Sequence, residues 1–133
     1  MSQIKPPVSR PLSPHLQIYR TMLSTTMSIT HRITGVGLAV GILGYVIWLT
    51  LAATSDQYFT FVQGLLSSWL GLLALFGMSW ALIHHMLGGL RHFVWDTGHG
   101  FKLNHVEWLV RANIIVSIAL TILLWAISYG VHA

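Results

Sequence analysis

The residue whose type and position best suit redox chemistry is His85. It lies in an uncharged apolar stretch, about a turn and a half before Arg91 if the segment is helical. The chain has no cysteine, so a neutral imidazole is the side chain through which it can bind haem iron. On a helix, His85 shares a face with Gly89 and His92, whereas His84 is rotated by about 100°. The glycine leaves room beside His85 for a bulky planar group.

A hydrogen-bonded packing role is the alternative for His85. Ionisable residues inside membrane helices are costly, and they usually face a bundle interior or a cofactor. If His85 binds haem, it provides one axial position, and no second histidine lies clearly within another apolar stretch. A partner chain would then have to provide the opposite ligand.

A second polar cluster stands where another apolar stretch begins, and it consists of Ser28, His31, Arg32 and Thr34. Ser28 and Arg32 are four residues apart, so they share a helical face and together suit a quinone carbonyl. His31 and Arg32 suit haem propionates, because charge-assisted hydrogen bonds favour carboxylates. The alternatives are structural: Arg32 as a boundary charge that reaches lipid phosphate, and Ser28 as a helix-start hydroxyl.

The elements that must position these residues are membrane helices. Of the 133 residues, 54% are hydrophobic and 8% are charged, which is too few charges to cover a water-exposed surface. Three uncharged stretches are each long enough to cross a hydrocarbon core of about 30 Å. The sequence therefore predicts an all-α integral membrane protein with three transmembrane helices. It forms a single membrane-anchor domain, 1–133, with a cytoplasmic N-terminal segment 1–27 and spans at about 30–53, 60–90 and 112–131.

The positions of the basic residues predict how these spans are oriented. Every Lys and Arg precedes the first span, stands at its start, or lies between the second and third spans. The positive-inside rule then puts the N-terminus in the cytoplasm and the C-terminus in the periplasm, with both polar clusters at the cytoplasmic end. The basic residues form no run, so nucleic acid is not an expected partner. Residues 1–20 resemble neither a secretory signal nor a transit peptide, which favours a bacterial inner membrane.

Two motifs are more specific than any single residue. The first is RPLSPHLQIYR at residues 10–20 followed by SITHRITG at 28–35, and the second is HMLGGLRHFVWDTGHG at 85–100. They resemble the S-x-x-H-R-x-[ST]-G entrance and the H-x-x-x-G-x-R-H-x-x-x-D signature of the cytochrome b subunit, or larger membrane anchor, of succinate dehydrogenase. Together with the three spans, the resemblance covers nearly the whole chain.

The resemblance implies a role for each polar position. His85, four residues before the Gly of G-x-R-H, matches the axial ligand of haem b. Ser28 and Arg32 match residues of the ubiquinone pocket, and His31 with Arg32 match positions near the haem propionates. The acidic and accessory positions of the second motif are Asp96, Arg91 and His92.

The resemblance also implies a complex. Succinate would be oxidised in a flavoprotein subunit, electrons would pass through an iron–sulfur subunit, and ubiquinone would be reduced at the membrane surface. This chain would carry no succinate site. It would form a haem-binding helical bundle with a smaller membrane anchor subunit, surrounded by membrane lipid, and would contribute part of the quinone pocket.

Three other functions compete with this one. An anchor of a quinol:fumarate reductase would serve the reverse reaction. A purely structural membrane anchor would bind no cofactor and would show no haem absorption that depends on His85. A small transporter or channel subunit would be expected to place polar residues at mid-membrane or to break its helices in related halves, and neither pattern is evident in the sequence.

Overall fold

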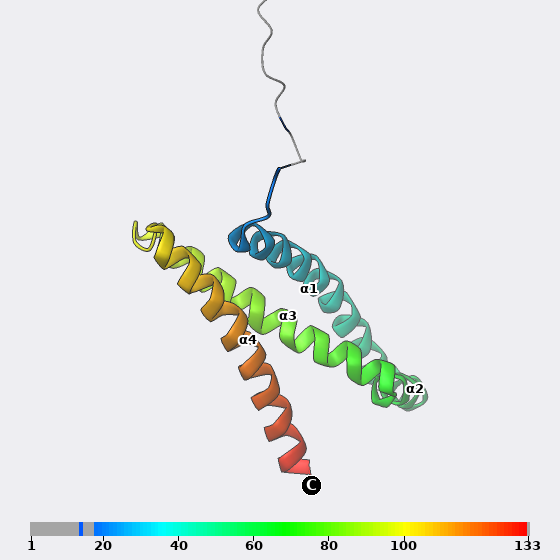
Figure 1. Ribbon diagram of the computed structural model, residues 1–133. Helices are drawn as coiled ribbons and strands as arrows, with labels where there is room; N and C mark the ends of the chain where they lie inside the picture. Colours follow the sequence, from blue (N-terminus) through cyan, green and yellow to red (C-terminus); the bar gives the residue numbers. More distant parts are fainter. Residues whose placement is uncertain (1–13, 15–17, 133) are drawn as a thin grey trace, which may run out of the picture.

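The computed structural model describes Pro14 and residues 18–132, and these residues form four helices and no strand. The helices are α1 (Leu23–Thr54), α2 (Asp56–Ser67), α3 (Trp69–Asp96) and α4 (Leu103–His132). The helices α1, α3 and α4 are long, and the short α2 lies at the end where α1 leads into α3 (Figure 1). α3 packs against both α1 and α4, which touch each other less extensively. The all-helical fold predicted from the sequence is confirmed.

Three helices are long and apolar enough to cross a membrane, with candidate spans at Leu23–Thr54, Trp69–Asp96 and Leu103–Val131. Their side chains are distributed in the opposite sense to those of a water-soluble bundle. Among the described residues, the buried apolar side chains are Met27, Ala81 and Val110, and the buried polar ones are Thr34, His84, Arg91, Asn113, Ser117 and Thr121. Hydrocarbon solvates apolar side chains well, so polar groups gain by turning inward and bonding across helices.

The first helix begins before the predicted first span. α1 starts at Leu23, so the last residues of the predicted N-terminal segment 1–27 are helical. Polar side chains are tolerated there because the hydroxyls of Ser28 and Thr30 donate to carbonyl oxygens four residues earlier, at 3.1 and 2.9 Å. Of the motif at residues 10–20, the structure describes Pro14 and residues 18–20.

The predicted second span, 60–90, differs from the structure because it is divided at Ser68. The backbone of Ser68 is extended, and its hydroxyl caps α3 by accepting a hydrogen bond from the Gly71 amide at 3.2 Å. A side chain at Gly71 would collide with the carbonyl groups at the end of α2. The serine cap and the glycine therefore allow α2 to end and α3 to start within one residue.

A short turn joins α3 to α4. Gly98 and Gly100 take φ values of 78° and 82°, a left-handed conformation that favours glycine. This turn and the start of α1 lie at the same end of the molecule, whereas α2 and the end of α4 lie away from it (Figure 1). The two polar clusters identified in the sequence therefore share one end of the fold.

Candidate functional site

The candidate site is built around two histidines that meet between α1 and α3. His31 comes from the third turn of α1, and His85 comes from the second half of α3. Their rings stack with centroids 3.9 Å apart and planes 14° from parallel. Both side chains are half-buried. The structure thus brings together one residue from each of the two sequence motifs.

Hydrogen bonds between the two histidines are reciprocal. His85 Nδ1 lies 3.0 Å from the His31 carbonyl oxygen, and His31 Nε2 lies 3.2 Å from the His85 carbonyl oxygen. A carbonyl oxygen can only accept, so in each neutral ring the nitrogen that faces it carries the proton. His85 is therefore the Nδ1–H tautomer, and its Nε2 keeps a lone pair without a hydrogen-bond partner among the described residues. A histidine in this state is prepared to bind a metal through Nε2.

Two glycines make this close approach possible. A Cβ atom at Gly35 would lie 2.9 Å from Cε1 of His85, and a Cβ atom at Gly88 would overlap the His31 ring. Gly89, which the sequence places on the same face as His85, has no atom within 4 Å of the position that its Cβ would take. Small residues at Gly35 and Gly88 therefore seat the two rings, and open space remains beside Gly89.

The other residues of the second motif surround this pair. The exposed His92 approaches His31 edge-on, with ring centroids 5.6 Å apart. Arg91 is 5% exposed and its guanidinium lies 5.0 Å above the centre of the Trp95 ring, a cation–π contact. Its Nε and Nη1 are buried without a hydrogen-bond partner in the part of the chain that the structure describes. Asp96 is the exposed last residue of α3.

Ser28 and Arg32 lie on α1 and are both exposed. The Ser28 hydroxyl donates to the Ser24 carbonyl oxygen at 3.1 Å, so its oxygen can still accept a bond from outside the helix. Among the described residues, the one ion pair joins Glu107 to Arg111 at 3.3 Å, and it leaves Arg32 free for an external partner. The predicted quinone-binding residues thus face away from the rest of the chain. They are close to His31 in sequence but take no part in the hydrogen bonds between His31 and His85.

His84 points in another direction from His85, towards α4. It is 1% exposed, and its Nδ1 lies 3.4 Å from Ser117 Oγ and 3.5 Å from the Asn113 amide nitrogen. The Ser117 hydroxyl donates to the Ile114 carbonyl oxygen at 2.9 Å, which leaves its own oxygen free to accept a hydrogen bond. The buried polar side chains of Asn113, Ser117 and Thr121 form a seam along α4 that was not predicted from the sequence. The sequence pattern that could have predicted this seam is the four-residue spacing of its polar side chains, at Asn113, Ser117 and Thr121.

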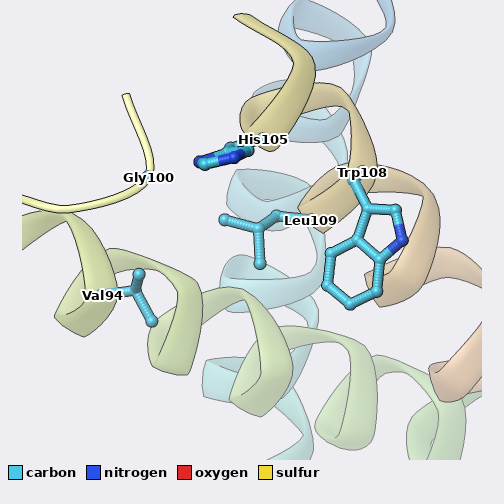
Figure 2. Close-up of a pocket in the computed structure, with 5 residues that line it drawn as sticks. All are labelled: Val94, Gly100, His105, Trp108 and Leu109. Atoms are coloured by element: carbon cyan, nitrogen blue, oxygen red, sulfur yellow. The ribbon is translucent and has the colours of Figure 1, made fainter. Parts of the chain in front are cut away.

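Two cavities of the described chain lie on the α3–α4 side. One, of about 280 Å³, sits at the turn between these helices, where His105 and Leu109 of α4 face Gly100 and Val94 (Figure 2). A neighbouring cavity of about 190 Å³ is lined in part by Arg91 and Asn113. Neither cavity is lined by the histidine pair or by the predicted quinone-binding residues.

The described residues also contain no group of three or more His, Cys, Asp or Glu side chains that could hold a metal ion by itself. A haem iron does not require such a group, because the porphyrin supplies four ligands and the protein one or two. The free Nε2 of His85 and the open space beside Gly89 fit haem better than they fit a bare metal ion.

Comparison with known proteins gives a consistent result. A sequence model of the succinate dehydrogenase/fumarate reductase transmembrane subunit family matches residues 7–127. The chain is 43% identical over 115 residues to the succinate dehydrogenase cytochrome b556 subunit of Paracoccus denitrificans, covering 86% of this chain and 88% of the relative. It is 40% identical over 118 residues to the subunit of the same name from Rickettsia felis, with 87% and 90% coverage.

A mitochondrial relative is similar over an equally large share of the chain. The succinate dehydrogenase cytochrome b560 subunit of Sus scrofa is 38% identical over 117 residues, covering 86% of this chain and 67% of the relative. These matches confirm the resemblance drawn from the two motifs. The chain therefore belongs to the succinate dehydrogenase/fumarate reductase transmembrane subunit family, and within it is similar to the cytochrome b membrane subunits of succinate dehydrogenase.

Proposed function

We propose that this chain provides His85 as one axial ligand of a haem b and, with Ser28 and Arg32, part of a ubiquinone-reduction site in a succinate dehydrogenase complex. The observation that carries the haem assignment is the hydrogen bond from His85 Nδ1 to the His31 carbonyl oxygen, at 3.0 Å. Metal-binding histidines usually donate their second ring N–H to a carbonyl or carboxylate, which fixes the tautomer and ring orientation. The names of the relatives, cytochrome b556 and b560 subunits, support haem as the metal group.

The residues around His85 would interact with different parts of the haem. When bound, haem b supplies a one-electron redox centre whose potential depends on its ligands and on burial. Arg32 would hold its propionates by charge. His31 would donate to a propionate through Nδ1 when the ring is protonated, because its Nε2–H already donates to the His85 carbonyl oxygen. Arg91, His92 and Asp96 are accessory positions near the same end of α3. The opposite axial ligand would come from a smaller anchor subunit.

The quinone site is proposed on the exposed side of α1. Ser28 and Arg32 are one turn apart on the same face, and a quinone carbonyl bound there would receive the guanidinium N–H groups. A fixed positive charge stabilises negative charge that develops on the quinone oxygen during reduction. Because both side chains face outward, the remaining walls of the site would come from the iron–sulfur subunit and the smaller anchor. The flavoprotein subunit would supply electrons from succinate.

The proposed location is a bacterial inner membrane, with the N-terminus in the cytoplasm and the C-terminus in the periplasm. The described basic residues support this orientation, because they gather at the start of α1 and around the α3–α4 turn, and these regions share one end of the fold (Figure 1). The relatives cited above are all named for succinate dehydrogenase, which favours succinate oxidation over a fumarate reductase.

The proposed function is tested by the reduced-minus-oxidised absorption spectrum of the purified membrane complex, recorded with a succinate-to-quinone assay. We expect His85→Ala to lose the b-type haem bands, because the substitution removes the imidazole proposed as the axial ligand. His84→Gln is the matched control: its amide can keep a hydrogen bond to Ser117, and the haem bands should persist. A His85→Ala complex with an unchanged spectrum would return the chain to the role of a structural anchor.

A further inference from the structure

We propose that Thr34 is a positioning residue for the haem ligand. Together with the His31 carbonyl, it holds His85 in the tautomer and ring orientation that present Nε2 to the iron. This inference rests on the proposed haem ligation by His85, and it assigns a role to a side chain that does not itself contact the haem iron. The sequence places Thr34 in the polar cluster with Ser28, His31 and Arg32 but gives no reason to link it to His85.

Thr34 is 5% exposed and lies where α1 faces the His85 ring. Its hydroxyl donates to the His31 carbonyl oxygen at 2.9 Å, as helical Thr side chains often do. With the proton directed there, the lone pairs of Thr34 Oγ1 remain for His85 Nδ1, which lies 3.3 Å away. The Nδ1–H of His85 therefore faces two acceptors, the His31 carbonyl at 3.0 Å and the Thr34 hydroxyl.

These contacts also prevent the imidazole from turning over. A 180° rotation of the ring would bring a C–H group, which bonds weakly, towards the two acceptors in place of Nδ1–H. The stacked His31 ring lies on one side at 3.9 Å, and the backbone at Gly35 is close enough that a Cβ there would meet Cε1 at 2.9 Å. The ring is thus held at its faces by packing and at its Nδ1 edge by hydrogen bonds.

The consequence for the metal is electronic. An acceptor at Nδ1–H increases the basicity of the other ring nitrogen, and a more basic ligand stabilises oxidised iron relative to reduced iron. Removing the Thr34 hydroxyl should therefore shift the haem midpoint potential to a more positive value, with the haem still bound. A purely structural role for Thr34 would affect the amount of folded complex and leave the potential of the surviving haem unchanged.

The test compares Thr34→Val, which keeps the shape and removes the hydroxyl, with Thr34→Ser, which keeps the hydroxyl. Thr50→Val is the matched control, because Thr50 lies on the same helix and its hydroxyl bonds only to the Val46 carbonyl oxygen, at 2.8 Å. Each purified complex is examined for haem content, for midpoint potential by redox titration, and for the g-values of the oxidised haem by electron paramagnetic resonance. We expect Thr34→Val to shift the potential upward and to change the g-values, while Thr34→Ser and Thr50→Val match the wild type.

Two results would overturn the proposal. One is a Thr34→Val complex with full haem content and with wild-type potential and g-values. The other is a Thr34→Ser complex that shows the same change as Thr34→Val, or that loses haem as Thr34→Val does, because the hydroxyl would then not be the deciding group. If His85→Ala retains the haem bands, the ligand assignment itself is wrong, and that result is distinct from either of these.

Discussion

Arg32 differs from its neighbour His31 in that its side chain is exposed and takes part in no ion pair among the described residues. Outside the hydrocarbon core, such a guanidinium is readily solvated by water or lipid headgroups. In the proposed complex it instead turns towards a quinone, and its charge matters most as the quinone oxygen becomes negative. In the proposed function, Arg32 therefore acts in a reaction that the isolated chain does not perform.

Replacing this residue tests the quinone half of the proposed function. For Arg32→Gln we expect succinate-to-quinone activity to fall by on the order of 10², the effect of removing one donor from a developing oxyanion. Succinate oxidation by a water-soluble electron acceptor should persist, and the haem bands should remain because His85 is intact. Arg111→Gln, which removes a surface ion pair with Glu107, should behave as the wild type. Equal loss of both activities in Arg32→Gln would argue for failed assembly in place of a quinone role.

At the scale of the helices, α3 packs against α1 on one side and α4 on the other, and it presents a different histidine to each. One side carries His85, stacked on His31 of α1, and the other carries His84, bonded to the seam on α4. Consecutive residues differ by about 100° around a helix, so adjacent histidines can face different neighbours. The close approach on the α1 side depends on Gly88, where any larger side chain would meet the His31 ring.

Substitution at this contact tests the helix packing. Alanine favours a helix over glycine by about 1 kcal/mol, so Gly88→Ala should stabilise α3 considered alone. In the complex we expect the opposite, a loss of about 1–3 kcal/mol from overpacking, with reduced haem content. Thermal loss of the haem bands measures the effect. Gly77→Ala is the control on the same helix, because no atom lies within 4 Å of its added Cβ. A Gly88→Ala complex as heat-stable as this control would show that the His31 ring is not held at Gly88.

Hydropathy predicted the three long helices because long uncharged stretches such as residues 33–53 are long and apolar enough to cross a membrane as helices. It missed the break at Ser68, where the residues on both sides are apolar and the change depends on one cap and one glycine. Helical spacing correctly separated His84 from His85, but it could not tell which of them faces α1. That distinction comes from how the helices dock, and so do the contacts of Thr34.

The described chain presents apolar side chains outward from most of its surface, and most of the side chains that it buries between the helices are polar. Such a surface requires lipid or other membrane helices as its surroundings. The basic residues at one end, and the lack of Lys and Arg at the opposite end, give the molecule a direction across the membrane.

This direction can be measured with reporter fusions in a bacterial host. We expect a reporter enzyme that is active only in the periplasm to be active when joined to the C-terminus and inactive when joined within the α3–α4 turn. A fluorescent protein that matures only in the cytoplasm should give the reverse pattern, since the turn carries Lys102 and adjoins Arg111. A periplasmic signal from the turn would reverse the proposed orientation and would place the quinone site on the wrong side for a cytoplasmic iron–sulfur subunit.

The reciprocal bonds between His31 and His85 have a consequence for the order of events during biogenesis. Each ring is tied to the backbone of the opposite helix, at 3.0 and 3.2 Å, so both bonds depend on the same register between α1 and α3. A slip of one residue moves a helix by about 1.5 Å along its axis, which is more than a hydrogen bond can stretch. The imidazole is therefore oriented only after the first and third helices have docked correctly. If α1 and α3 are paired in the correct register, an incoming cofactor finds the His85 imidazole already oriented. In any other register the imidazole is misaligned, so cofactor binding would select correctly paired helices.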